Sequence, residues 1–287
     1  MKQLTVISGK GGTGKTSITA AFASIAENAV FADCDVDAAD LHLIFKPDIK
    51  ETMIFHGLKI ASIDKEKCTD CKKCYNNCRF DAIDEDINSI KESCEGCGLC
   101  EYICPVDAIQ MTDRESGFSY ISDTRFGPMA HAMLKTAEEA SGKLVTVVRN
   151  NAKALAEKKK KDLIVIDGPP GIGCPVISSI SGVNLVLIVT EPTLSAIHDL
   201  ERVLGVAQHF KIPAVVCINK YDVNLDNTEK IEYYCKSNDI DVVGKLPYDN
   251  VITEAMIHEK NVIEYSKGDF SDMIIEMWNN MRGILKP

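Results

Sequence analysis

The chain has 287 residues, 45% of them hydrophobic, and a formal net charge of −10 at pH 7. This negative charge argues against nucleic acid or an anionic membrane as the main partner. No apolar run approaches the ~20 residues that span a bilayer, and the chain opens without a long apolar signal segment, so we expect a cytoplasmic protein. Its twelve cysteines then favour metal binding over disulfides.

The N-terminal stretch predicts the start of an α/β fold. A short apolar strand at residues 4–8 runs into a glycine loop, an Ala-rich helix at 14–27 and a second strand at 29–33. Further strands are expected at residues 163–167, 185–190 and 214–219, with helices at 141–161 and 193–210. Val-, Ile- and Leu-rich strands that alternate with helices predict a mostly parallel sheet covered by helices on both faces.

A phosphate-binding loop follows the first strand. The sequence GKGGTGKTS, residues 9–17, matches G-x-x-x-x-G-K-[ST] between a predicted strand and a predicted helix. Lys15 would reach the β- and γ-phosphates, and the Thr16 hydroxyl would bind Mg²⁺. The alternative is a glycine-rich turn with chance lysines, and the strand–helix context argues against it. The expected nucleotide-binding residues of the loop are Gly9, Lys10, Gly11, Gly12, Thr13, Gly14, Lys15, Thr16 and Ser17.

The second lysine of the loop, Lys10, carries a resemblance. KGGTGKT resembles the deviant loop of the MinD/ParA group, which includes the nitrogenase iron protein and the Mrp-type iron–sulfur carriers. In that group this lysine reaches across a homodimer interface to phosphates bound by the other subunit. The resemblance implies a P-loop NTPase fold, Mg-ATP as a cofactor, a nucleotide-gated homodimer, and catalytic roles for Lys10 and Lys15. A solvated Lys10 without such a role is the alternative.

Acidic residues after two strands resemble the switches of the same group. DCDVDAADLHL, residues 33–43, resembles the first switch, so Asp35 would face the γ-phosphate, Mg²⁺ and the attacking water, supported by Asp33 or Asp37. LIVIDGPPGIG, residues 163–173, resembles the Walker B strand and second switch. Asp167 would then hold Mg²⁺ through water, and Thr16, Asp35 and Asp167 would form the magnesium site.

Two later segments resemble the base-recognition region. INKYD, residues 218–222, ends a predicted strand, and the resemblance implies that Asn219 contacts adenine and that Pro247 of KLPYD packs near the base. Asn and Pro are also common turn formers at strand ends, which is the alternative interpretation.

An acidic, cysteine-rich stretch at residues 58–112 interrupts the α/β pattern. Two C-x2-C-x2-C-x3-C motifs match the bacterial two-cluster ferredoxin run, in which the fourth cysteine of each motif binds the other cluster. We therefore expect two [4Fe–4S] clusters in an inserted α+β bacterial ferredoxin-like domain, residues 58–112, within an ATPase domain of residues 1–57 and 113–287. Zinc and disulfides do not call for this doubled spacing. The expected ligands are Cys68, Cys71, Cys74 and Cys104 for cluster one, and Cys78, Cys94, Cys97 and Cys100 for cluster two.

One position departs from the ferredoxin pattern. Arg79 stands where proline usually follows the fourth cysteine, as Pro105 does in the second motif. Proline is not a ligand, so we expect both clusters to be retained, while the added charge could shift a reduction potential.

Three functions fit these motifs. We rank first an ATPase whose homodimer gates low-potential electron transfer to a partner protein, and second a maturation or carrier protein for iron–sulfur or metal cofactors. The third is a MinD-like positioning switch, which needs a basic amphipathic membrane helix. The tail, residues 271–287, offers only Arg282 and Lys286 as cations, so we expect a helix packed on the sheet. Cys174, in the second switch, is either a small buried residue at a strand-to-helix turn or a functional thiol.

Overall fold

The protein is described from a computed structural model, which defines residues 1–135, 138 and 141–285. The strands are β1 (Lys2–Ser8), β2 (Ala29–Asp33), β3 (Asp48–Ile63), β4 (Ile109–Thr124), β5 (Gly127–Leu134), β6 (Leu163–Pro170), β7 (Leu185–Thr190), β8 (Ala214–Asn219) and β9 (Val242–Leu246). The α-helices are α1 (Lys15–Ala23), α2 (Leu41–Phe45), α3 (Lys73–Asn77), α4 (Leu99–Tyr102), α5 (Ser141–Lys158), α6 (Cys174–Ile180), α7 (Leu194–His209), α8 (Leu225–Ser237), α9 (Val251–Ile257), α10 (Val262–Tyr265) and α11 (Asp269–Leu285). Two 3₁₀ turns are η1 (Lys91–Ser93) and η2 (Tyr221–Val223).

The strands join one sheet in the order β3-β4-β5-β2-β6-β1-β7-β8-β9. Every pairing from β5 to β9 is parallel, with β1 central between β6 and β7. The expected mostly parallel α/β sheet of a P-loop protein is confirmed, and β1, β2, β6, β7 and β8 lie at the predicted apolar runs.

The strands β3, β4, β5 and β9 were not expected from the sequence. β4 and β5 are joined by only Arg125 and Phe126, a connection too short for a parallel pair, so they form an antiparallel hairpin. Polar residues interrupt β3 and β4, and their burial is irregular along the strand. They therefore lack the continuous apolar pattern that identifies the other strands.

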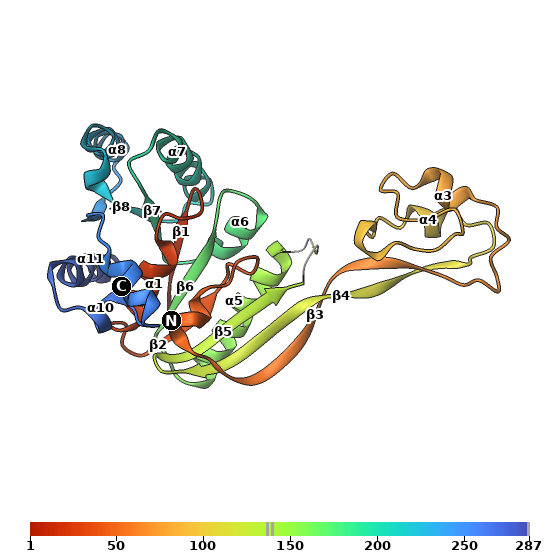
Figure 1. The fold of residues 1–287 in the computed structure, drawn as a ribbon, viewed down its shortest axis with the longest axis horizontal. Coiled ribbons are helices and arrows are strands. Elements are labelled where there is room, and N and C mark those ends of the chain that lie inside the picture. The colour runs from red at the N-terminus through yellow and green to blue at the C-terminus, as the bar shows by residue number, and fades with distance from the viewer. Residues whose placement is uncertain (136–137, 139–140, 286–287) are drawn as a thin grey trace. The chain divides into compact units, whose positions relative to one another are not determined.

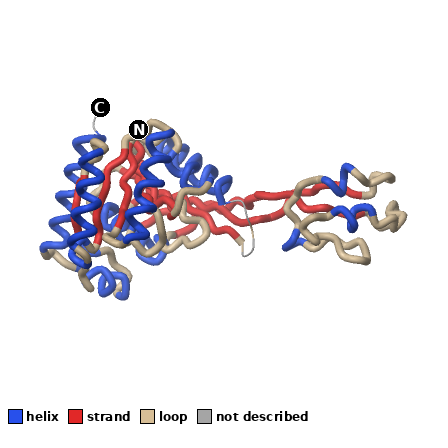
Figure 2. The backbone as a smooth tube through the Cα atoms, turned by 90° about the horizontal axis from the view of Figure 1, so that it is seen from above, coloured by secondary structure: helices blue, strands red, loops and turns tan. Residues whose placement is uncertain are grey.

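The two faces of the sheet are covered by different helices. In β1, Leu4 and Val6 point into a core shared with α1 and α11. Side chains alternate along a strand, so Gln3 and Thr5 point the other way. There Gln3 accepts a hydrogen bond from Arg149 of α5, and Thr5 contacts the carbonyl of Ser179 of α6. Figure 2 shows helices on both sides of these strands. The C-terminal helix packs on the sheet as expected, and no helix in the described ranges is long and apolar enough to cross a membrane.

The chain divides into two compact units. Unit 1 comprises residues 1–52, 119–132 and 141–287, and unit 2 comprises residues 53–118 and 133–140. The predicted domain boundaries, 58 and 112, fall inside β3 and β4. The assignment of domains at those boundaries stays a prediction.

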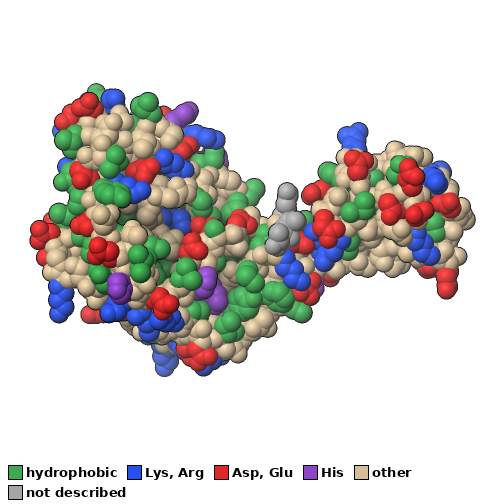
Figure 3. Space-filling view, in the orientation of Figure 1, with side chains coloured by type: hydrophobic (Ala, Val, Ile, Leu, Met, Phe, Trp, Pro, Cys, Tyr) green, Lys and Arg blue, Asp and Glu red, His purple; other side chains and the backbone are tan. Residues whose placement is uncertain are grey.

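Unit 2 is built on an internal repeat. Every cysteine of the first motif lies 26 residues before its counterpart in the second. The short helices α3 and α4 hold matching cysteines and lie next to each other (Figure 1). A small apolar core around Ala61, Ile83 and Ile109 includes two buried cysteines. Around it, Figure 3 shows acidic side chains interspersed with lysines and arginines. The backbone repeats as well, with left-handed φ at the matching pairs Asp70 and Gly96, Lys72 and Gly98, and Asp81 and Asp107.

Candidate functional site

The glycine loop between β1 and α1 surrounds an open cavity. Gly12 and Gly14 have φ of 79° and 90°, left-handed conformations that glycine adopts easily. A Cβ at Gly11 or Gly12 would meet nothing within 4 Å, so the loop backbone there faces open space. Residues 11–17 line a cavity of about 510 Å³ together with Asp35, a size suited to a small-molecule ligand. Lys10 and Gly9 are not part of this lining.

Lys15 lies at the centre of the site. Its Nζ is 3.1 Å from Asp35 Oδ2, 3.3 Å from Asp167 Oδ1 and 3.3 Å from Thr16 Oγ1, and the residue is 6% exposed. Burial alone would lower the pKa of Lys15, but Asp167, Asp35 and Asp33 outweigh it and raise the pKa above its usual value. The predicted catalytic residues Lys15, Asp35 and Asp167 are therefore brought together.

Asp167 is a buried carboxylate with one oxygen unpaired in the described part of the chain. It is 1% exposed, and its Oδ2 has no hydrogen-bond partner among the described residues. Its Oδ1 is 3.1 Å from the Thr19 hydroxyl, which is also 3.0 Å from the Lys15 carbonyl. Three carboxylates face one lysine here, so Mg²⁺ fits the charge and the oxygen donors of the site. Thr19 was not expected from the sequence, because it lies outside the motif.

Asp33 supports the loop that presents Asp35. Its Oδ1 accepts from the amide of Asp35 at 3.1 Å, and its Oδ2 accepts from the amide of Leu41 at 3.3 Å. Burial, followed by repulsion from Asp167, raises the pKa of Asp33 well above its usual range. Asp37 lines the cavity instead. Of the two proposed supporting residues, Asp33 makes the contacts.

Lys10 points away from the cavity of its own chain. Its Nζ is 2.7 Å from Glu191 Oε1, 3.1 Å from Thr193 Oγ1 and 3.3 Å from Ser195 Oγ. The other oxygen of Glu191 pairs with Lys220 at 3.1 Å. Sequence reasoning missed Glu191 and Lys220, since nothing in either segment marks an ion pair with the loop.

Asn219 and Pro247 adjoin the loop on the other side. Asn219 Nδ2 donates to the carbonyl of Thr13 at 2.8 Å, and its Oδ1 accepts from the amide of Lys220 at 3.0 Å. Asn219, Pro247 and Tyr248 line a cavity of about 240 Å³ that also includes Gly12 and Gly14. The two predicted base-site residues thus share one cavity beside the phosphate loop.

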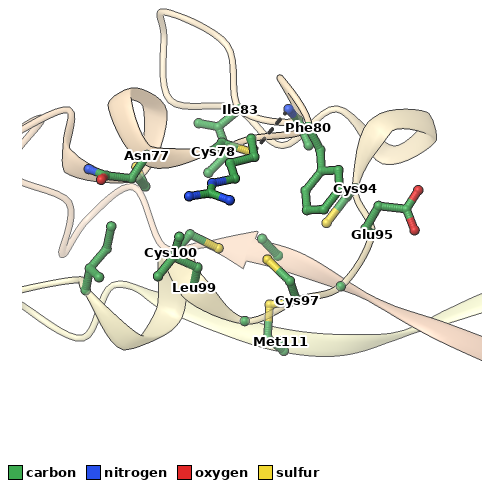
Figure 4. A pocket seen from close by; sticks show the side chains of 17 residues that line it. Asn77, Cys78, Phe80, Ile83, Cys94, Glu95, Cys97, Leu99, Cys100 and Met111 are labelled. Carbon is green, nitrogen blue, oxygen red and sulfur yellow. Dashed lines mark hydrogen bonds between the residues drawn. The ribbon is translucent and has the colours of Figure 1, made fainter.

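The eight cysteines of unit 2 line two cavities. One cavity, of about 320 Å³, is lined by Cys78, Cys94, Cys97 and Cys100, together with Cys74 and apolar side chains (Figure 4). A second, smaller cavity is lined by Cys68, Cys71, Cys74 and Cys104. The amide of Ala82 donates to Cys78 Sγ at 3.4 Å, and the amide of Ala108 donates to Cys104 Sγ at 3.3 Å.

Three further observations concern metal binding and the other candidate residues. Among the described residues, no three His, Cys, Asp or Glu side chains already converge tightly enough to hold a single metal ion. Arg79 is exposed and lines the larger cavity beside Cys78. In unit 1, Cys174 is exposed at the first position of α6, so the expectation of a buried residue there is wrong.

The sheet, the glycine loop and the buried carboxylates define a P-loop nucleotide-binding protein. The model of the CobQ/CobB/MinD/ParA nucleotide-binding domain matches residues 4–262, so the chain belongs to this family. It therefore carries the nucleotide-binding domain of the CobQ/CobB/MinD/ParA family.

The chain is similar to the following relative and solved structures. The uncharacterised protein MJ0578 of Methanocaldococcus jannaschii is 36% identical, over 98% of this chain and 96% of its own. The cell division ATPase MinD of Pyrococcus furiosus has a TM-score of 0.61 at 18% identity, covering 99% of both chains. MinD of Pyrococcus horikoshii, solved with Mg-ADP, also has a TM-score of 0.61 at 18% identity, covering 99% of this chain and 98% of its own. These structural likenesses show the fold.

Proposed function

We propose that the protein is a homodimeric ATPase in which ATP binding and hydrolysis gate low-potential electron transfer from two [4Fe–4S] clusters to a partner protein. The observation that carries the proposal is the lining of the two cavities of unit 2. Each contains one complete set of four cysteines, and each set combines both motifs in the crossed pattern expected of a two-cluster ferredoxin.

The surroundings of the cysteines suit clusters better than isolated ions. Four cysteines bind a [4Fe–4S] cluster, one for each iron, so the thiols need not converge on one point. Apolar side chains such as Ile83 and Met111 line the larger cavity and would exclude water. The amides of Ala82 and Ala108 donate to one sulfur in each set, and such bonds stabilise thiolates. When bound, the clusters would supply one-electron redox chemistry, with electrons from an external low-potential donor.

The nucleotide site would hold Mg-ATP. The loop amides of residues 11–17 would surround the phosphates, with Lys15 neutralising the β- and γ-phosphates. Thr16, Asp35 and Asp167 would hold Mg²⁺, and the free Oδ2 of Asp167 supports this placement. Asp35 would orient the attacking water, and Asn219 and Pro247 would contact the base.

The second lysine is the argument for a dimer. Lys10 is bound to residues around the start of α7 and not to its own phosphate cavity. It is therefore not engaged with the phosphate cavity of its own chain, and it would exchange Glu191 for the phosphates of a second copy. We place the protein in the cytoplasm and assign residues 58–112 to the ferredoxin-like domain and the remainder to the ATPase.

Iron content is the test of the proposal. Protein purified without oxygen should hold about eight iron atoms per chain and, after reduction, give the spectrum of two interacting clusters. Cys104→Ser should lose iron, whereas Cys174→Ser should keep it, because Cys174 lies outside both cavities. A wild-type preparation with stoichiometric zinc and no iron would refute the proposal.

One observation favours maturation or carrier activity as the second candidate. Cys174 is exposed, unlike the buried Cys34, Cys217 and Cys235, so a thiol is available at the second switch. Loss of cluster transfer to an apo-acceptor in Cys174→Ser, with iron content unchanged, would favour this function. Unchanged transfer in that variant would show that the exposed Cys174 thiol has no part in it.

A further inference from the structure

Arg114 and Glu138 form a buried ion pair inside unit 2. Nε of Arg114 lies 2.7 Å from Oε1 of Glu138, and both side chains are 3% exposed. Two charges removed from water in this way are screened little by salt and act strongly on their surroundings.

The same guanidinium holds the peptide of a cluster cysteine. Nη1 of Arg114 donates to the carbonyl of Lys91 at 2.5 Å and to the carbonyl of Cys94 at 3.2 Å. Lys91 and Cys94 are the first residue and the C-cap of η1. Arg114, on β4, therefore fixes the turn that carries Cys94 into the larger cavity.

The first half of the repeat has no matching charge. The residue 26 positions before Arg114 is Asn88, which is neutral. The side-chain amide of Asn88 bonds to Asp84 at 3.1 Å. The two halves of unit 2 share cysteine spacing and backbone conformation, but only the second has an arginine at this position.

We propose that Arg114 is a positioning residue for the larger cavity, and that its pair with Glu138 sets the reduction potential of a cluster held by Cys78, Cys94, Cys97 and Cys100 apart from that of the other cluster. This inference rests on the proposed function, because it requires two clusters. A nearby positive charge favours the reduced form of a cluster, which carries one more electron, and a negative charge disfavours it. Arg114 therefore raises this potential, and Glu138 moderates the effect.

Redox titration of matched variants tests the inference. Wild type, Arg114→Gln and Glu138→Gln are prepared without oxygen and titrated with dithionite, while both clusters are followed by electron paramagnetic resonance. Arg114→Gln should lower the potential of one cluster by an amount equal to a tenfold change in its reduction equilibrium, about 59 mV. Glu138→Gln should raise the same potential. The affected cluster should be the one altered in Cys97→Ser.

Glu115→Gln is the control, because Glu115 pairs with Lys135 at 2.5 Å in the same unit but both side chains are more than a third exposed. It should move neither potential. Arg114→Lys keeps the charge, so it should hold its iron and stay nearer the wild-type potential than Arg114→Gln, and it carries the test if Arg114→Gln does not fold.

The outcomes separate this inference from the proposed function. Shifts of both clusters together, shifts of the two variants in one direction, or unchanged potentials with full iron would overturn the inference and leave the proposed function standing. A wild-type protein without iron would overturn both.

Discussion

Lys10 Nζ lies 2.7 Å from Glu191 Oε1, and the same carboxylate pairs with Lys220 through its other oxygen. Lys220 in turn donates to the carbonyl of Gly12 in the phosphate loop. Glu191 thus links Lys10, which belongs to the loop, to Lys220, which contacts the loop at Gly12. The lysine assigned to the partner's nucleotide is held in a defined position on its own chain.

Replacement of Lys10 should separate binding from hydrolysis. Lys10→Ala should retain most ATP binding, because Lys10 does not line its own cavity, but lose hydrolysis on the order of 10³-fold, as expected for a charge supplied in trans. Lys15→Ala should lose binding itself. Isothermal titration and phosphate release measure the two effects, and wild-type hydrolysis in Lys10→Ala would contradict the assignment.

Asp35→Asn should bind ATP but turn it over slowly. The amide cannot serve as a charged ligand or orient water as the carboxylate does, so we expect a loss of roughly 100-fold in turnover. Asp40→Asn is a suitable control, because Asp40 lines the same cavity but has no contact with Lys15. Equal losses in both variants would show a general charge effect.

Thr19→Val should weaken Mg²⁺ binding without unfolding the protein. The valine keeps the shape but removes the hydroxyl within 3.1 Å of Asp167, at a cost of about 1 kcal/mol in stability. Magnesium dependence of ATP hydrolysis measures the effect. Unchanged magnesium dependence would mean that Thr19 does not orient Asp167.

Cys104→Ser should damage the cluster of the first motif, although Cys104 belongs to the second. It lines the smaller cavity with Cys68, Cys71 and Cys74. We expect loss of about four iron atoms per chain and retention of one cluster signal. Loss of the signal that Cys97→Ser also removes would contradict the crossed ligand sets.

The sequence predicts the central strands and the loop well, because their signals are local. The run at residues 163–167 is almost wholly apolar, and β6 occupies Leu163–Pro170. The strands β3 and β4 escape prediction because each is long and interrupted by polar residues such as Lys50 and Asp113.

Contacts between distant segments account for the rest. Lys10 and Glu191 are 181 positions apart, and only the sheet brings the ends of β1 and β7 together. Arg114 likewise meets Glu138 across 24 positions with no motif to connect them. The grouping of the cysteines around two cavities agrees with the motif spacing, because that spacing is a constraint within the sequence itself, and the two ligand sets stay a prediction.

The most direct test of nucleotide gating is the reduction potential of the clusters with and without Mg-ATP. Mg-ATP should shift at least one potential in the wild type, by the equivalent of a tenfold change in equilibrium, about 59 mV. The shift should be absent in Lys15→Ala, which keeps its clusters but cannot bind the nucleotide. Identical potentials in the wild type with and without Mg-ATP, at full iron content, would contradict the coupling of ATP to redox chemistry.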